Sequence, residues 1–201
     1  MLVVGLTGGI ASGKSTVSAL LKERCYMVLD ADEFARDVAK PHTAGWQEIW
    51  EVFGEEYFHP DGSLDRSRLA ETIFRDATAR HRLNEIIHPK VLALIESRIQ
   101  ESRNRGESLV IVDVPLLFEV GWDKQVDKVV VVYVKPEIQL ARLLERDNLT
   151  LEEAQNRIAA QLPLSLKAQQ ADYVIDNSGS LEDTSRQVDM IMDTLLRGYR
   201  Q

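Results

Sequence analysis

The amino-acid sequence predicts an α/β protein with a five-stranded, mainly parallel sheet flanked by helices. Two observations lead to this fold class. Five short apolar runs have the length of strands buried on both faces, and segments with helical spacing separate most of them. Strands and helices that alternate in this way build a parallel sheet with right-handed crossovers. The expected strands are residues 2–6, 26–30, 109–113, 128–134 and 173–176.

Length and charge limit the classes of function. A chain of 201 residues with 44% hydrophobic residues is long enough for one well-buried core, so we expect a single domain. Its net charge of -8 argues against a nucleic-acid partner or an anionic membrane partner, because such surfaces carry a basic excess. The lone Cys25, the absence of a signal-like N-terminal pattern and the lack of a bilayer-length apolar run predict a cytoplasmic protein.

Two excursions interrupt the alternation of strands and helices. The segment between the second and third strands has no convincing strand and is longer than one crossover needs, so we expect an inserted helical lobe at about 41–108. Around His88-Pro89 the pattern predicts two helices or one kinked helix. A charged helical segment at about 147–170 is expected to be a movable lid. The core is then about 1–40, 109–146 and 171–201.

Residues 6–16, which read LTGGIASGKST, contain the most specific motif of the chain. Gly8-x-x-x-x-Gly13-Lys14-Ser15 is a Walker A pattern, after a strand and at the start of a helix as that motif requires. The glycines let backbone N–H groups point inward and the helix adds its positive dipole, which together make a phosphate cradle. Lys14 is expected to reach the β- and γ-phosphates, and Ser15 to bind Mg²⁺. The expected nucleotide-binding residues are Gly9, Ile10, Ala11, Ser12, Gly13, Lys14, Ser15 and Thr16.

The rest of the chain narrows the use of this nucleotide. A GTPase needs a guanine-reading Asn-Lys-x-Asp, and no Asn here is followed by Lys. A motor ATPase or transporter subunit needs coupling machinery, for which little chain is left. The sequence therefore favours a small ATP-dependent kinase whose helical lobe takes the acceptor. Two alternatives stay open: a kinase of another small hydroxyl metabolite or nucleotide, and a non-catalytic protein that binds ATP only to close the lid.

The stretch Asp30-Ala31-Asp32 follows the second strand, and ligands of open α/β sheets bind at the carboxyl ends of strands. A carboxylate there can take the proton of an attacking hydroxyl, which makes Asp32 the candidate general base. The alternative is that Asp32 only caps the helix that begins near Glu33. For Asp30 we expect a structural role.

Further charged residues are candidates for the same chemistry. Asp113 ends an apolar run and resembles a Walker B acid that contacts Mg²⁺, although a structural role is equally open. Arg142 and Arg146 lie four residues apart, on one helix face, and with Arg157 they are candidates for a triphosphate clamp. The alternative is a solvated face neutralised by Glu145 and Asp147.

The assembled residues resemble the dephospho-coenzyme A kinase family along nearly the whole chain. The matching segments, whose order and spacing carry the resemblance, are LTGGIASGKSTV at 6–17, DADEFAR at 30–36, FG at 53–54, DGSLDRSRLAETIF at 61–74, HP at 88–89, DVPLLFE at 113–119, RD at 146–147 and ADYVIDNSGSLED at 171–183.

The resemblance implies a core like that of nucleoside kinases, an acceptor-binding helical lobe and a lid. It implies transfer of the ATP γ-phosphate to the ribose 3′-hydroxyl of dephospho-CoA, giving CoA and ADP. Separately, we expect a monomer or weak homo-oligomer. Asp32 would be the base, Lys14 and Arg142 would stabilise the transferring group, Ser15 would hold Mg²⁺, and Asn177 would lie beside adenine. The residues implied near the acceptor are Thr7, Asp32, Arg36, His88, Pro115, Leu116, Leu117 and Phe118. From the residues alone, His88 is also open to a role at a helix boundary.

Two positions depart from the family pattern. Cys25 and His42 stand where the family has, or often has, glycine. Because glycine suits a left-handed backbone that other residues adopt reluctantly, the sequence leaves the turn geometry at these two positions open, and we expect the chemistry to be unaffected.

Overall fold

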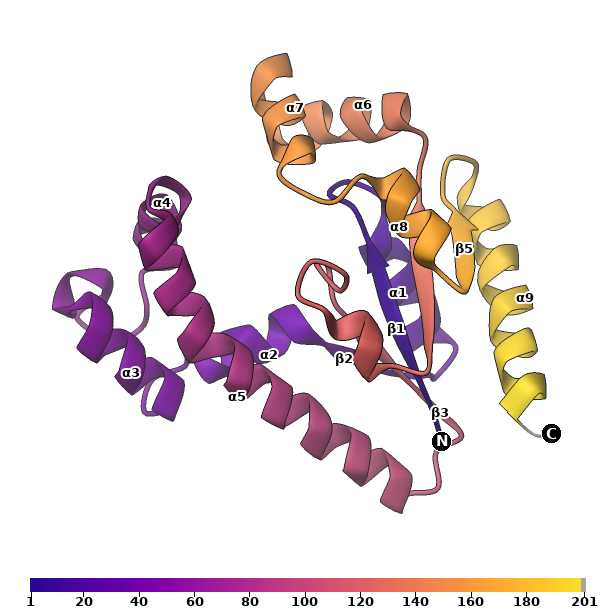
Figure 1. Ribbon diagram of the computed structural model, residues 1–201, viewed down its shortest axis with the longest axis horizontal. Coiled ribbons are helices and arrows are strands. Elements are labelled where there is room, and N and C mark those ends of the chain that lie inside the picture. The colour runs from indigo at the N-terminus through magenta and orange to yellow at the C-terminus, as the bar shows by residue number, and fades with distance from the viewer. Residues whose placement is uncertain (200–201) are drawn as a thin grey trace. The chain divides into compact units, whose positions relative to one another are not determined.

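The computed structural model describes residues 1–199 (Figure 1). The chain divides into two compact units, Met1–Leu29 with Glu101–Gln201 and Asp30–Gln100. The first unit contains the sheet and the phosphate loop, and the second contains helices from the expected insertion. Each unit is described by itself.

The sheet has five strands in the order β2-β3-β1-β4-β5. Strand β1 pairs in parallel with β3 and with β4, and β4 pairs in parallel with β5. The predicted α/β fold class is therefore confirmed. The strands are β1 (Leu2–Gly8), β2 (Met27–Asp30), β3 (Leu109–Asp113), β4 (Lys128–Tyr133) and β5 (Tyr173–Asp176).

One face of the sheet is covered by α1 (Lys14–Glu23) and α9 (Leu181–Tyr199). Val17 and Leu21 from α1, with Val188 and Met192 from α9, pack on alternate residues of the strands, such as Leu6. This alternation follows from the period of two along a strand, which sends every second side chain to the same face. The apolar core fixes β1, and therefore the loop that follows it.

The C-terminal half of the first unit adds η2 (Trp122–Gln125), α6 (Pro136–Asp147), α7 (Leu151–Ala159) and α8 (Leu164–Gln170). Pro136 begins α6, and Thr150 with Glu153 forms a reciprocal capping box at α7. Figure 1 shows α6 and α7 projecting beyond the sheet and α8 returning to it, where α8 lies against β4.

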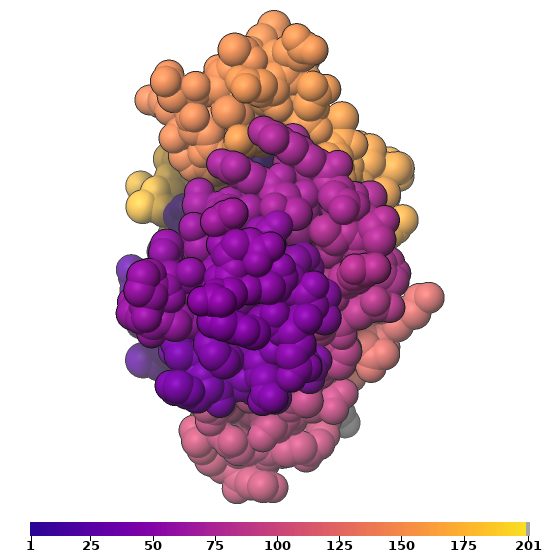
Figure 2. Space-filling model, turned by 90° about the vertical axis from the view of Figure 1, so that its left-hand side faces the viewer, coloured from indigo at the N-terminus to yellow at the C-terminus, as the bar shows by residue number. Residues whose placement is uncertain are grey.

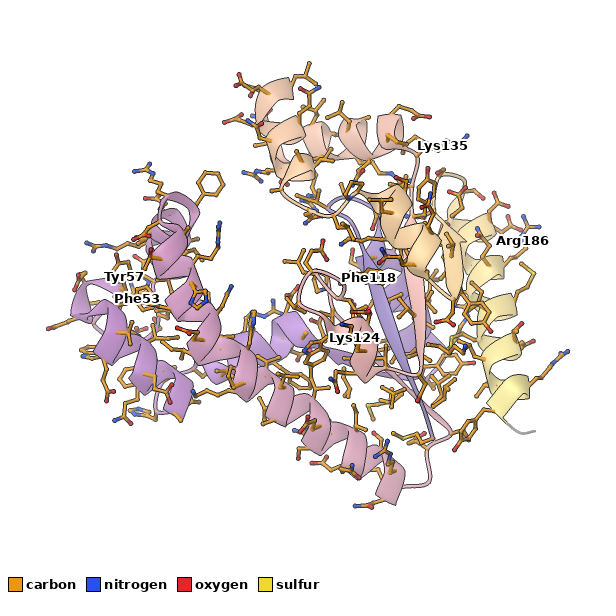
Figure 3. All side chains as sticks on the ribbon, in the orientation of Figure 1. Phe53, Tyr57, Phe118, Lys124, Lys135 and Arg186 are labelled. Carbon is orange, nitrogen blue, oxygen red and sulfur yellow. The ribbon has the colours of Figure 1, made fainter. Side chains whose placement is uncertain are left out.

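The second unit consists of α2 (Ala31–Val38), α3 (Ala44–Phe53), η1 (Glu55–Tyr57), α4 (Arg66–Arg75) and most of α5 (Ala77–Asn104). Its core joins Ala39, Ile49, Leu69 and Ile86, with Phe53 and Tyr57 stacked edge to face beside it (Figure 3). The violet and magenta atoms of Figure 2 are part of this unit's surface. Helix α5 continues through Pro89, so the structure has one helix at that position.

The two positions at which the family resemblance leads us to expect glycine both have the left-handed backbone that glycine favours. Cys25 has φ 62° and His42 has φ 69°. The Cys25 N–H donates to the Lys22 carbonyl, and the Tyr26 N–H donates to the Leu21 carbonyl. These two bonds form a Schellman end to α1, a motif whose left-handed residue is usually glycine. The chain therefore keeps the turn and accepts the strain of a side chain there.

None of the helices within residues 1–199 combines the length and the apolar character that crossing a bilayer requires.

Candidate active site

The loop between β1 and α1 has an alternating left-handed backbone that turns its amides toward one point. Ala11 has φ 57° and Gly13 has φ 86°. Within residues 1–199, the amides of Gly13, Lys14 and Ser15 have no acceptor in the protein. They lie at the positive end of α1, where the helix dipole favours an anion. This geometry forms a phosphate cradle.

Two glycines of this loop are required by close packing. A Cβ at Gly8 would lie 2.5 Å from Ser12 Oγ, and one at Gly13 would lie 2.0 Å from Asn177 Nδ2. Ser12 is fully buried, and its hydroxyl is the one buried side-chain polar atom without a hydrogen bond among the described residues. The loop is therefore held by tight contact as well as by hydrogen bonds.

Lys14 and Asp113 face each other at the ends of α1 and β3. The Lys14 ammonium donates to Asp113 Oδ1, and Asp113 is only 2% exposed. Strand β3 neighbours β1, so the carboxyl ends of both strands reach the same edge of the sheet. The structure brings these two predicted site residues together.

The oxygen ligands at this edge fit Mg²⁺. In phosphate-binding sites Mg²⁺ is held by one or two protein oxygens, with phosphate oxygens and water completing the shell. The Ser15 hydroxyl, exposed in the first turn of α1, and the Asp113 carboxylate are hard oxygen donors of this kind. No group of three or more His, Cys, Asp and Glu side chains within the described chain could hold a metal alone.

Asn177 and Arg142 stand directly behind the loop. Asn177 is 6% exposed, and its Nδ2 donates to the Ser12 carbonyl at 2.8 Å while its Oδ1 accepts from the Thr184 hydroxyl at 2.9 Å. Arg142 Nη2 donates to the Asn177 carbonyl at 3.0 Å. Asn177 therefore supports the backbone of the phosphate loop, and it ties Arg142 to the same position.

Arg146 and Arg157 share one counter-charge, Asp147. Arg146 Nε lies 2.7 Å and Arg157 Nη1 2.9 Å from the Asp147 carboxylate. Hydrogen bonding to Arg146, with the charge of Arg157, holds the pKa of Asp147 below its usual range. The same bond raises the pKa of Arg146. Both arginines are therefore paired with Asp147, as expected for the alternative in which they lie on a solvated helix face with acidic counter-charges.

Thr7 and residues 115–118 form one connected piece beside the loop. The Thr7 hydroxyl donates to the Pro115 carbonyl at 3.0 Å. Leu117 is fully buried, whereas Leu116 is 40% exposed. Phe118 lies in the turn after β3 (Figure 3). Of the predicted acceptor residues in this segment, Leu116 and Phe118 therefore have exposed surface, and Leu117 is part of the core.

The other predicted acceptor residues belong to the second unit. Asp30 caps α2 by accepting from the amides of Asp32 and Glu33, so the structural role expected for Asp30 is confirmed. The alternative that Asp32 caps this helix is wrong, because Asp30 is the cap. The Asp32 side chain is exposed. Arg36 is exposed and accepts Arg66 Nη2 on its carbonyl. His88 is an exposed residue in the interior of α5, so the role at a helix boundary is wrong, and partial desolvation lowers its pKa.

Several contacts to the loop come from residues that the sequence did not single out. Gln139 Nε2 donates to the Ile10 carbonyl, and the Ile10 amide donates to Gln161 Oε1, both at 2.8 Å. Lys167 Nζ donates to the Gly8 carbonyl. The available signal was a polar residue among apolar neighbours: Lys167 follows Leu164 by three residues, on the face that α8 buries.

The sheet with β1 at its centre, the phosphate cradle and the Lys14–Asp113 pair define a phosphate-loop kinase. A family model described as dephospho-CoA kinase matches residues 2–183. The chain belongs to the dephospho-CoA kinase family, and it is a kinase of coenzyme A biosynthesis.

Individual relatives agree with this family. The chain is 49% identical to a dephospho-CoA kinase of Symbiobacterium thermophilum, over 94% of this chain and 79% of that protein. It is 46% identical to the dephospho-CoA kinase of Arabidopsis thaliana, over 98% of this chain and 85% of that protein. The solved dephospho-CoA kinase of Campylobacter jejuni superposes with a TM-score of 0.74 at 27% identity, covering 98% of both chains.

Proposed function

We propose that this chain transfers the γ-phosphate of ATP to the ribose 3′-hydroxyl of dephospho-CoA, giving CoA and ADP. Family membership supports the pair of substrates. The phosphate-transfer part of the proposal rests on the cradle at the start of α1, where three amides have no acceptor among residues 1–199. Phosphoryl transfer depends mainly on positioning and on electrostatic stabilisation, which such a cradle supplies before substrate binds.

Lys14 and Arg142 are the proposed cations of the transition state. Lys14 begins α1 beside the free amides, and its pairing with Asp113 holds the ammonium at the edge of the sheet. Arg142 is held against the Asn177 carbonyl, next to Gly13. A preorganised cation stabilises charge on the transferring group without having to reorganise during the reaction. Arg146 is a third candidate. Its guanidinium could leave the Asp147 carboxylate and bind a phosphate group of ATP, so that its charge would stay paired.

Asp32 is the proposed general base. The Asp30 cap makes the first turn of α2 rigid without using the Asp32 side chain, and Asp32 is exposed. An ionised carboxylate within hydrogen-bonding distance of the acceptor hydroxyl would take its proton as the phosphate arrives. The proton moves from the 3′-oxygen to Asp32, and a new bond joins that oxygen to the γ-phosphorus. The bond between the γ-phosphorus and the β,γ-bridging oxygen breaks, and ADP leaves with that oxygen.

Ser15 and Asp113 are the proposed Mg²⁺ residues. When bound with ATP, Mg²⁺ supplies charge neutralisation at the β- and γ-phosphate oxygens. The remaining proposed ATP contacts are Gly9 to Gly13, Thr16 and Asn177. The remaining proposed acceptor contacts are Thr7, Arg36, His88, Pro115, Leu116 and Phe118, whereas the buried Leu117 belongs to the core. A cytoplasmic location and a monomeric or weakly associating state stay predictions from the sequence.

The role of Asp32 is tested with a matched pair of variants. Asp32→Asn should lower turnover with dephospho-CoA by roughly 10²–10⁴-fold, the usual contribution of a general base, and should leave ADP affinity nearly unchanged. Asp37→Asn makes the same chemical change on the same helix, where Asp37 forms an ion pair with Lys40 at the surface. It should keep full turnover. Asp32→Asn turning over at the parent rate would overturn the assignment.

A further inference from the structure

Lys167 is a fully buried lysine in a helix that the proposed chemistry does not use. It lies on α8, where its side chain is 0% exposed. Removing an ammonium group from water costs several kcal/mol unless every donor finds an acceptor, so a lysine that served only to fill space would be a poor choice. Its surroundings therefore indicate what it does.

The three donors of the Lys167 ammonium reach three acceptors. Nζ lies 2.7 Å from Glu119 Oε1, 3.1 Å from the Gly8 carbonyl and 3.4 Å from the Pro115 carbonyl. Gly8 is the first residue of the phosphate motif, and Pro115 follows the β3 strand that ends at Asp113. The lysine thus joins the two strand ends that hold the phosphate loop and the candidate metal ligand.

The same region is fixed at further points. Glu119 Oε1 also accepts the Leu162 amide at 3.0 Å, so one carboxylate holds the chain before α8 as well as Lys167 within it. The Ile10 amide donates to Gln161 Oε1, and the Pro115 carbonyl also accepts the Thr7 hydroxyl. Lys167 is therefore the centre of a connected set of bonds that links the segment 161–167 to both sides of the phosphate loop.

We propose that Lys167, held by Glu119, is a positioning residue for nucleotide binding and phosphoryl transfer. It fixes the Gly8 carbonyl relative to the end of β3, and so sets the spacing between the amide cradle and Asp113. The inference rests on the proposed function for the reaction it assists, and on the geometry of the first unit alone for its effect on nucleotide binding. Lys167 touches no reacting atom, and its effect passes through the backbone of the loop.

The test measures binding of Mg-ADP by calorimetry at a temperature at which each variant is folded. Lys167→Met removes the ammonium at similar volume, and should weaken ADP binding at least tenfold. Lys128→Met is the matched control, because Lys128 pairs with Asp172 at the surface, 2.8 Å away. It should bind ADP as the parent does. Lys167→Met binding ADP with the parent affinity would overturn the proposal.

A double variant separates positioning from stability. Lys167→Met leaves Glu119 without its cation, which should lower the melting temperature. Adding Glu119→Gln removes the unpaired charge and should reverse most of the fall in melting temperature. The Gly8 carbonyl still lacks its donor in the double variant, so ADP binding should stay weak. ADP affinity that recovers together with the melting temperature would show a merely structural lysine. Since ADP binding needs no acceptor, this result is independent of whether dephospho-CoA is the substrate.

Discussion

Asn177 gives the sharpest test of how the phosphate loop is held. Its buried side chain bridges the Ser12 carbonyl and the Thr184 hydroxyl, and a Cβ at Gly13 would meet its amide at 2.0 Å. Asn177→Ala leaves the Ser12 carbonyl without its side-chain donor, which costs about 1–3 kcal/mol in a buried position. The vacated space adds about 1 kcal/mol, for a total of about 2–4 kcal/mol.

The Thr184 hydroxyl is not left unpaired in this variant, because it also reaches the Ser180 carbonyl at 3.2 Å. At roughly 3 °C per kcal/mol for a chain of this size, the melting temperature should fall by about 6–12 °C. Affinity for Mg-ADP should fall as well, because the loop backbone loses the group that fixes it. Scanning calorimetry and titration calorimetry measure the two effects.

Thr184→Val is the matched control. It removes the donor to Asn177 Oδ1 and should cost about 1 kcal/mol, while the bond from Asn177 Nδ2 to Ser12 is kept. ADP affinity should then stay close to that of the parent. Asn177 does not fix the loop for ADP binding if Asn177→Ala binds ADP as tightly as the parent, or if Thr184→Val weakens binding to the same extent.

Three further predictions follow from other parts of the first unit. Lys14→Ala should lower kcat/KM by roughly 10²–10³-fold in steady-state assays, and an unchanged value would exclude Lys14 from the transition state. Cys25→Gly should raise the free energy of unfolding by about 0.5–1 kcal/mol by relieving the left-handed strain at φ 62°, with Cys25→Ala near zero in the same denaturant titrations. Carboxyl NMR should show that Asp147 titrates below the ordinary aspartate range. Its pairing with the arginines therefore stabilises the fold above the ordinary aspartate pKa, and this stabilisation is lost as the pH falls through the lowered pKa. Arg146→Gln should raise the pKa of Asp147.

The sheet could be predicted from the sequence because its signals are local. Residues 109–113 and 173–176 are strands at the predicted bounds, since a short apolar run between polar residues leaves few alternatives. The phosphate loop could be predicted equally well, because its glycines and Lys14 lie close together in the chain. Local rules left open whether one or two helices surround Pro89, because proline normally ends or kinks a helix. In the structure Pro89 lies inside the single helix α5.

The residues that support the phosphate loop could not be predicted from local sequence patterns. Lys167 and Gly8 meet across 159 positions of sequence, and the local signal, the spacing of Lys167 from Leu164, does not say which residues the lysine contacts. Asn177 was expected beside adenine by resemblance, and its side-chain bonds to Ser12 and Thr184 depend on the pairing of β4 with β5 and on the position of α9. Long-range contacts of this kind carry no periodic signal.

The proposed reaction is tested by following Mg-ATP consumption with dephospho-CoA, adenosine, AMP or no acceptor, and by identifying the product by its mass and by the position of its new phosphate. We expect dephospho-CoA to gain phosphate at the ribose 3′-oxygen, with one ADP released for each CoA formed. ADP release without a phosphorylated acceptor, or phosphate gained on adenosine or AMP in preference to dephospho-CoA, would contradict it.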